Sequence, residues 1–181
     1  MATYIYVDNS DVWIEGQRVS AVRKKHANDI VQAMNEQIFD PTWRMDFGAL
    51  LRLAGGYDKA AIGRAVLFGS KPPDTDTLWA AARRNGFEVV APDRVHGREK
   101  KIDTSIATEM TSAPLDCQLD PKRDRFVLVG GDRDFVPPVE KLRGWGYPVT
   151  AVFWDHAAGE LRDTATEFRS LNRSIDLLTR R

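Results

Sequence analysis

Two aspartates that follow a pair of glycines are the residues best placed to do chemistry, in the run Gly130-Gly131-Asp132-Arg133-Asp134. The apolar run Arg125 to Val129 precedes them and predicts a strand that ends in this turn. Glycines let a backbone approach a ligand closely, and two neighbouring carboxylates repel each other unless a positive group lies between them. The simpler interpretation is a helix cap, which needs only one of the two acids. The pair therefore favours a cation-binding turn.

Two further aspartates stand where a parallel α/β sheet presents its ligands. Asp8 follows the apolar run Thr3 to Val7, and Asp103 lies at the entrance of an apolar helical stretch. Each alone is explained equally well by an Asx turn or a helix cap. Ligands of such sheets bind beyond the carboxyl ends of the strands, so both carboxylates are candidates for the crevice that Asp132 and Asp134 face.

If the four aspartates meet, they form an all-oxygen site. Hard oxygen ligands select Mg²⁺ or Mn²⁺ over zinc, and the three histidines show no ligand spacing. One or two such ions activate water and steady a leaving oxygen in phosphoryl displacement. Lys100 and Lys101 flank Asp103 and are candidates to hold a phosphate, with plain solvation as the alternative. The hypothesis is hydrolysis of a phosphodiester.

The elements that would position these residues alternate between strand and helix patterns, which predicts a mostly parallel sheet covered on both faces. Five strands are predicted, at residues 3–7, 61–68, 87–91, 125–129 and 148–154. Helices are predicted at 20–37, 46–53, 74–85, 103–112, 135–145 and 159–170, with a loop at 112–124 and a possible short strand at 174–177. We expect one three-layer α/β/α domain over residues 1–181.

Composition narrows the setting of this domain. Hydrophobic residues make up 43% and charged residues 29% of the 181 residues, as in a globular protein. The formal net charge is zero, so any case for nucleic-acid binding rests on local patches such as Arg83-Arg84 or residues 94–101. The single cysteine, Cys117, excludes an internal disulfide, and the N-terminal run resembles a buried strand rather than a signal peptide. We expect a cytoplasmic location and no membrane association.

The ordered motifs resemble the NYN domains, a LabA-like branch of the PIN-like nucleases. The matching segments lie in the family's order across nearly the whole chain: residues 6–10, 68–73, 99–104 and 130–137. This resemblance implies a five-stranded parallel sheet of order 3-2-1-4-5. It also implies that Asp8, Asp103, Asp132 and Asp134 bind Mg²⁺ or Mn²⁺ and act in catalysis, with RNA, single-stranded or structured, as the substrate. A homodimer is compatible with it.

The resemblance also assigns supporting roles near the first motif. Asn9 and Ser10 are expected to orient its loop or touch a metal-bound water, and Ser70 to contact phosphate. Asp11 departs from the pattern, because many relatives carry Asn there; an acid that points into solvent is favoured over a fifth carboxylate in the site. Trp13 is expected to be the best exposed of the five tryptophans for stacking on a base.

Three alternatives remain to the function of a metal-dependent ribonuclease that cuts within an RNA chain. The first is an inactive domain of this family that binds RNA or regulates a partner. The second takes Asp132 and Asp134 as the Asp-x-Asp motif of a nucleotide-sugar transferase, for which the chain is short. The third is a phosphatase with a first-strand aspartate nucleophile, which is disfavoured because Ser10 stands where a second aspartate is needed.

Overall fold

A six-stranded, wholly parallel sheet forms the centre of the computed structural model, which describes residues 1–69, 77–91 and 100–180. The strand order is β3-β2-β1-β4-β5-β6. The strands are β1 (Thr3–Asp8), β2 (Ile62–Phe68), β3 (Glu88–Val90), β4 (Arg125–Val129), β5 (Val149–Phe153) and β6 (Glu167–Ser170). The predicted order 3-2-1-4-5 is confirmed, and one further strand is added at the edge.

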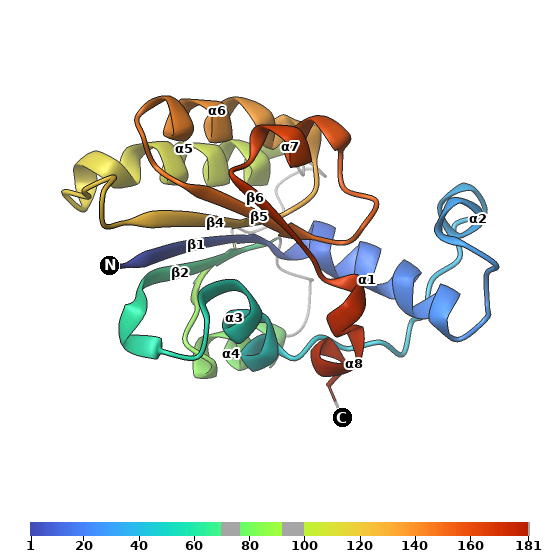
Figure 1. Ribbon diagram of the computed structural model, residues 1–181. Coiled ribbons are helices and arrows are strands. Elements are labelled where there is room, and N and C mark those ends of the chain that lie inside the picture. Colours follow the sequence, from blue (N-terminus) through green and yellow to red (C-terminus); the bar gives the residue numbers. More distant parts are fainter. Residues whose placement is uncertain (70–76, 92–99, 181) are drawn as a thin grey trace.

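Helices cover both faces of this sheet and make the three layers visible in Figure 1. Helices α5 (Lys100–Asp116), α6 (Val136–Gly144) and α7 (Gly159–Thr164) lie on one face. On the other lie α1 (Asn9–Arg23), α3 (Phe47–Gly55), α4 (Thr77–Arg84) and α8 (Ile175–Leu178), while α2 (Ile30–Asn35) packs against α1. In the described part of the chain, no helix is long and apolar enough to cross a membrane.

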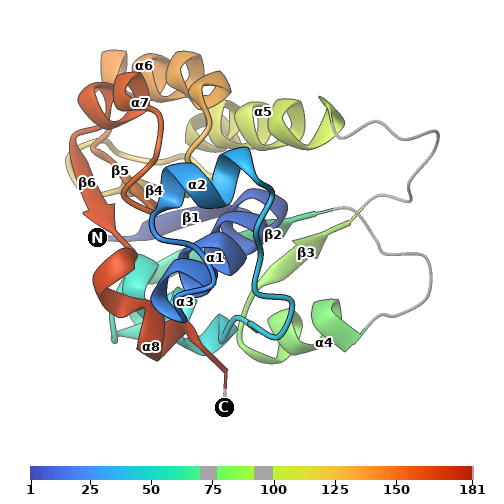
Figure 2. The ribbon, with the colours of Figure 1, turned by 90° about the vertical axis from the view of Figure 1, so that its right-hand side faces the viewer.

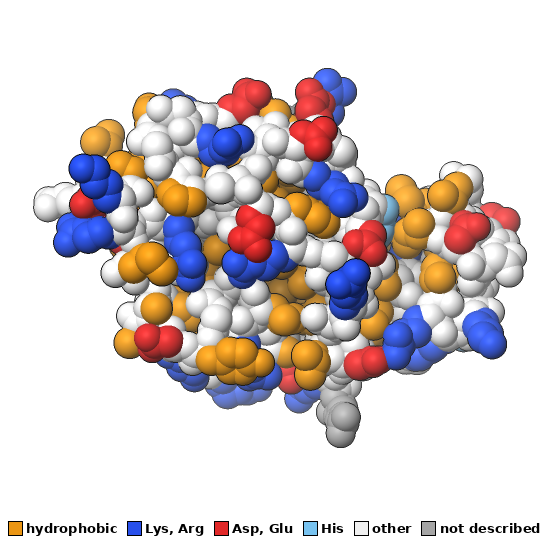
Figure 3. Space-filling model, in the orientation of Figure 1, with side chains coloured by type: hydrophobic (Ala, Val, Ile, Leu, Met, Phe, Trp, Pro, Cys, Tyr) orange, Lys and Arg blue, Asp and Glu red, His pale blue; other side chains and the backbone are white. Residues whose placement is uncertain are grey.

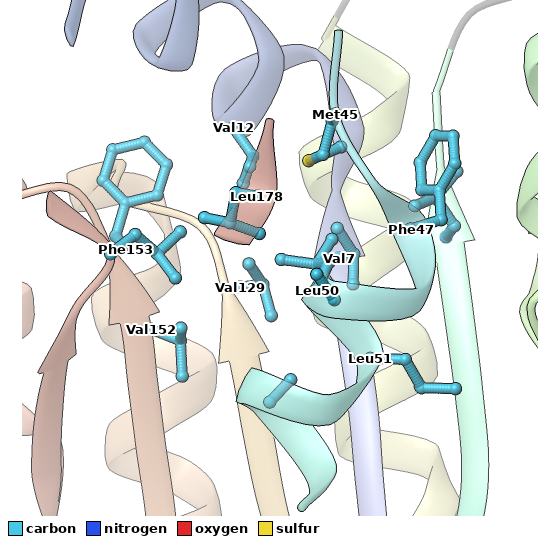
Figure 4. Packing of buried hydrophobic residues seen from close by; sticks show 14 of the residues in the cluster. Val7, Val12, Met45, Phe47, Leu50, Leu51, Val129, Val152, Phe153 and Leu178 are labelled. Atoms are coloured by element: carbon cyan, nitrogen blue, oxygen red, sulfur yellow. The ribbon is translucent and has the colours of Figure 1, made fainter. Parts of the chain in front are cut away.

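Alternation along the strands gives each face its own core. In β1, Ile5 and Val7 point to the cluster under α1 and α3, whereas Tyr6 points to the cluster under α5 and α6. Figure 4 shows the first cluster, in which side chains from α1, α3 and α8 gather over β1, β4 and β5. Burial on both faces is why these strands read as continuous apolar runs.

One helix prediction in the N-terminal third needs correction. The predicted helix over 20–37 is two helices, and the first begins much earlier, at Asn9. The polar first turn of this helix and its Gly16 gave the sequence no helical pattern before residue 20. A β-carbon on Gly16 would lie 2.5 Å from the Trp43 ring and 2.9 Å from the Trp154 ring. The glycine therefore serves close packing of the helix and does not break it.

The C-terminal predictions need correction as well. The helix α5 runs to Asp116 through Pro114, so part of the predicted loop over 112–124 is helical. Residues 159–170 hold both α7 and strand β6, whose sequence Glu-Phe-Arg-Ser has a single apolar residue because it is an edge strand. Residues 174–177, predicted as a strand, are helical: Ser174 ends a short 3-10 helix and the other three belong to α8.

Candidate functional site

The candidate site lies at the edge of the sheet where the strands end, which faces the viewer in Figure 2. Strand β1 pairs in parallel with both β2 and β4, and Val7 lies opposite Val129. The residues that follow these two strands therefore emerge side by side. This is the point where the winding of the sheet reverses, as in other open α/β sheets that bind ligands.

A pocket of about 190 Å³ at this edge gathers carboxylates from four segments of the chain. Asp8 comes from the end of β1, Asp11 from the first turn of α1, Asp103 from the first turn of α5, and Asp132 from the turn after β4. The pocket is lined by Asp8, Ser10, Asp11, Ile14, Ile102, Asp103 and Asp132. Three of the four predicted acids are thus brought together.

Asp8 is held in place by the start of α1. It is only 6% exposed, and its Oδ1 accepts a hydrogen bond from the Asp11 backbone N–H at 3.1 Å. The helix-cap interpretation and the site interpretation of Asp8 are therefore both satisfied, because a carboxylate has a second oxygen.

Asp11 does not point into solvent, so the surface interpretation favoured from the sequence is wrong. It lines the pocket, and its Oδ2 accepts a hydrogen bond from the Gly131 backbone N–H at 2.9 Å. This bond joins the first turn of α1 to the turn after β4, across 120 positions of the chain. In the sequence, the only indication that Asp11 belongs to the site was the presence of an additional acid next to the first motif.

The glycine pair after β4 allows the close approach that its sequence predicts. A β-carbon on Gly131 would stand 2.1 Å from carbons of the Phe153 ring, a distance that no real β-carbon tolerates. A β-carbon on Gly130 would stand 3.0 Å from the Phe135 ring and 3.7 Å from the β-carbon of Asp8. The turn thus lies tightly between β5 and the first acidic residue.

Asp132 and Asp134 separate at this turn. The Asp132 Oδ1 caps the short helix Arg133–Phe135 by accepting from the Asp134 N–H at 3.0 Å, and Asp132 also lines the acidic pocket. Asp134 instead lines a neighbouring, larger groove together with Asp103. The predicted pair is therefore split between two adjoining hollows.

Burial and crowding hold protons on this cluster. Desolvation, then the charge of Asp11, raises the pKa of Asp8 to about 7, with further contributions from the charge of Asp103 and a side-chain hydrogen bond to it. Desolvation likewise raises the pKa of Asp11 to about 6, against the lowering effect of its bond from Gly131, and nearby Glu15 adds repulsion. Removing the protons near neutral pH leaves several buried negative charges in a small space.

The donor set of this pocket suits a hard divalent cation. All four acids offer oxygen alone, and concentrated carboxylate charge is the environment in which Mg²⁺ or Mn²⁺ replaces protons. Within residues 1–69, 77–91 and 100–180, however, no three His, Cys, Asp or Glu side chains stand in an arrangement ready to hold a metal ion. Asp8, Asp11 and Asp132 each accept a hydrogen bond from a backbone N–H with one oxygen, and each has a second carboxylate oxygen.

The supporting residues predicted from the sequence are placed unevenly. Ser10 lines the acidic pocket, whereas Asn9 is buried beside it with its Oδ1 lacking a hydrogen-bond partner among the described residues. Ser70 lies outside the described residues, as do the side chains of Lys100 and Lys101, although the backbone of both lysines belongs to α5.

The aromatic and histidine residues also differ from expectation. Trp13 is partly buried and packs edge-on against Trp43, with ring centroids 6.0 Å apart, so it is not the most exposed tryptophan. That residue is Trp145, at 45% exposure. His156 forms a hydrogen bond of 2.6 Å with Glu15 of α1. It belongs to no metal-ligand group among the described residues.

The sequence matches the NYN domain family over residues 9–172. The chain therefore belongs to the NYN domain family and has its PIN-like nuclease fold. The family assignment agrees with the sheet order and with the position of the acidic pocket at the reversal of the winding.

A solved structure shares the whole fold. The crystal structure of a protein of unknown function from Vibrio parahaemolyticus superposes with a TM-score of 0.65 at 19% identity, covering 94% of this chain and 92% of that one. At this identity the likeness shows the fold alone. No curated protein matches the sequence.

Proposed function

We propose that this protein is a metal-dependent ribonuclease that cuts within RNA chains. The observation that carries the proposal is the convergence of Asp8, Asp11, Asp103 and Asp132 on one small pocket. Nothing in a globular fold requires four carboxylates at one point, and their mutual repulsion opposes folding. A cation that needs them is the physical reason for such an arrangement.

In this proposal the acids hold Mg²⁺ or Mn²⁺ and the neighbouring side chains hold the substrate. A bound divalent ion supplies activation of a water molecule and neutralisation of charge on the leaving oxygen. Asp8 and Asp11 contribute to the site from the first motif, Asp103 from α5 and Asp132 from the turn after β4. Ser10 faces the pocket and is suited to orient water there, and Lys100 and Lys101 are proposed to contact phosphate.

Asp134 has a different position and is proposed to act at the edge of the site. It lines the groove that adjoins the pocket through Asp103. The site therefore has an acidic interior and an open side along which a polymer can enter. That geometry suits a long substrate better than a small phosphoester or a nucleotide sugar, which need an enclosed cavity.

The substitution Asp132→Asn tests the proposal. It removes one carboxylate and its repulsion of Asp11 but keeps an amide oxygen to cap the turn. We expect cleavage of RNA with Mg²⁺ or Mn²⁺ to fall by about 100-fold or more, since even changes behind metal ligands cost 10- to 100-fold. Asp163→Asn, exposed on α7, is the matched control and should cut normally.

Cleavage is measured on gels with an internal and an end-labelled RNA, beside a small phosphoester as a second substrate. Cutting by Asp132→Asn at the rate of the unaltered protein would refute the assignment. RNA that is bound but left intact with either cation would instead identify an NYN domain that binds RNA without cutting it. Release of phosphate from the small ester alone would indicate a phosphatase.

A further inference from the structure

A groove of about 890 Å³ lies between α5 and α6. It adjoins the acidic pocket, because Asp103 lines both. The two helices pack side by side, and both start at the edge of the sheet that carries the site (Figures 1 and 2). Anything that leaves the acidic pocket along this side enters the groove.

One wall of the groove is a stripe of threonines along α5. Thr108 donates its hydroxyl to the Thr104 carbonyl at 2.8 Å, and Thr111 donates to the Ala107 carbonyl at 2.8 Å. Their donors are thus used within the helix, so they offer methyl groups and acceptor lone pairs outward. Such a wall is poorly suited to phosphate, which needs donors, and better suited to the faces and edges of bases.

The opposite wall, at the start of α6, is apolar as well. Val136, Pro137 and Pro138 line it, and the prolines have no backbone N–H to offer an anion. These two walls are therefore uncharged, although Asp103, Asp134 and Glu160 also line the groove.

The cations of the groove are few. Arg133 is paired with Glu160 at 2.7 Å, and both line the groove. Lys141 has no carboxylate partner among the described residues; its Nζ lies 5.1 Å from the centre of the Trp145 ring. Trp145 directly follows α6, four positions after Lys141 and on the same side of the helix, and is 45% exposed. A free ammonium group next to an exposed indole is a pair that can contact one phosphate and one base.

We propose that the groove binds a single-stranded stretch of RNA next to the acidic pocket, with bases on the threonine and proline walls, a phosphate on Lys141 and a base stacked on Trp145. This inference rests on the proposed function for the identity of the polymer. A duplex presents mainly its charged backbone, so its binding needs many spaced cations, whereas among the described residues this groove has one unpaired lysine. A single strand exposes base faces that apolar walls can cover.

The length of the groove agrees with this substrate. From Asp103 to Thr111 the α5 axis rises about 12 Å, at 1.5 Å per residue. That length accommodates about three nucleotides at the 3.4 Å spacing of stacked bases. The groove therefore defines a short binding segment beside the bond that is cut.

Affinity for an uncut single strand tests the groove. The probe is a fluorescent, unstructured oligouridine of about 10 nucleotides, a length within the range of known single-strand sites, compared with a duplex of the same length. Binding is measured by anisotropy with Mg²⁺ in the Asp132→Asn background, so that the probe stays intact. We expect the single strand to bind at least about 10-fold more tightly than the duplex.

Two substitutions, one in the groove at Lys141 and one beside it at Trp145, should weaken this binding. Trp145→Ala is expected to lower affinity for the single strand about 5-fold or more, and Trp145→Phe, which keeps a ring, to restore most of it. Lys141→Ala is expected to lower affinity and to reduce the slope of log K against log salt by about one. Lys59→Ala, on the opposite edge of the sheet within a cluster that includes Arg84, is the matched control and should bind normally. Thermal melts confirm that each variant is folded.

Equal affinity for duplex and single strand would overturn the proposal, as would a loss in Lys59→Ala that equals the loss in Lys141→Ala. Normal binding by Trp145→Ala would also overturn it. If the groove variants weaken binding while the unaltered protein cuts no RNA, the groove stands as an RNA-binding surface and only the nuclease assignment fails.

Discussion

Asp8 is the residue on which the acidic pocket centres, because it is buried and meets both Asp11 and Asp103. Its pKa, raised to about 7 from the ordinary 3.8, means that the folded protein without a cation holds a proton that the unfolded chain has already released. The contribution of Asp8 to stability is therefore fully present below about pH 4 and is lost as the pH rises to about 7. A bound divalent cation opposes this loss by neutralising the ionised cluster.

The substitution Asp8→Asn should remove most of this pH dependence. Asparagine cannot ionise but still accepts the hydrogen bond that starts α1. In chelator, we expect the unaltered protein to lose on the order of 2 kcal/mol more than Asp8→Asn between pH 5 and pH 8. Denaturant unfolding at the two pH values gives the difference directly.

The same variant should respond weakly to cations. Mn²⁺ at pH 8 should raise the melting temperature of the unaltered protein and raise that of Asp8→Asn much less, because a ligand has been lost. Asp163→Asn on the surface serves as the control for removing a carboxylate. If the unaltered protein and Asp8→Asn lost the same stability between pH 5 and pH 8, the raised pKa of Asp8 would be contradicted.

Sequence alone located Asp8, Asp103 and Asp132, since each follows a strand or opens a helix at the edge where ligands bind. It could not place Asp11. The role of that residue depends on α1 starting at Asn9, which sets its side chain one turn later against the Gly131 N–H. A contact between residues 120 positions apart follows from packing, and no local pattern encodes it.

At the scale of elements, the turn between β4 and α6 does most to shape the site. It carries Asp132 and Asp134, donates a hydrogen bond from the Gly131 N–H to Asp11, and passes close to the Phe153 ring at Gly131. The Ala158 N–H also bonds the Gly131 carbonyl at 2.9 Å, so both backbone groups of this glycine are used. The turn therefore has little freedom to accept a side chain.

The substitution Gly131→Ala should test this constraint. A methyl group 2.1 Å from the buried Phe153 ring forces the ring or the turn to move, which costs about 1–3 kcal/mol and displaces Asp132. Gly144→Ala is the matched control, because a β-carbon there meets nothing within 4 Å and alanine is favoured in a helix. Chemical denaturation and RNA cleavage measure both effects; a Gly131→Ala protein as stable and active as the control would show that the turn can yield.

The elements that the sequence patterns missed, β6 and the first part of α1, each lack a continuous apolar pattern, for different reasons. Strand β6 is at the edge, with one neighbour and one apolar side chain, so it lacks the continuous apolar run of the inner strands. Helix α1 opens with the polar residues Asn9, Ser10 and Asp11, and it carries Gly16 where it packs closely against Trp43 and Trp154. By contrast, β4 was predicted to the residue because it is buried on both faces.

At the scale of the whole molecule, the mixed charge pattern explains why the net charge gave no indication of nucleic-acid binding. Figure 3 shows lysines and arginines interspersed with aspartates and glutamates over one face, in keeping with a net charge of zero. The acids of the candidate site are concentrated in a small pocket, and the groove beside it has one unpaired lysine among the described residues. Recognition of RNA is thus proposed to depend on a few local contacts and bound cations.

The C-terminal segment completes the core on the side of α1 and α3. The Arg180 N–H bonds the Arg44 carbonyl at 2.8 Å, and the Asp46 N–H bonds the Leu178 carbonyl at 2.7 Å. Leu178 is fully buried in the cluster that also holds Val12 and Val129, as Figure 4 shows. The last helix therefore joins residues near position 45 to the strands that carry the site.

Two adjacent leucines of α8 separate this packing role from any general effect of composition. Leu178→Ala leaves a cavity in the core and should cost about 2–5 kcal/mol, which lowers the melting temperature by about 5 °C or more. Leu177→Ala, at a position 64% exposed, should change stability by less than about 0.5 kcal/mol. Thermal and urea unfolding of the pair measure the contrast. If both variants melted with the unaltered protein, the segment would be an appendage, and the acidic edge would owe its geometry to β1 and β4 alone.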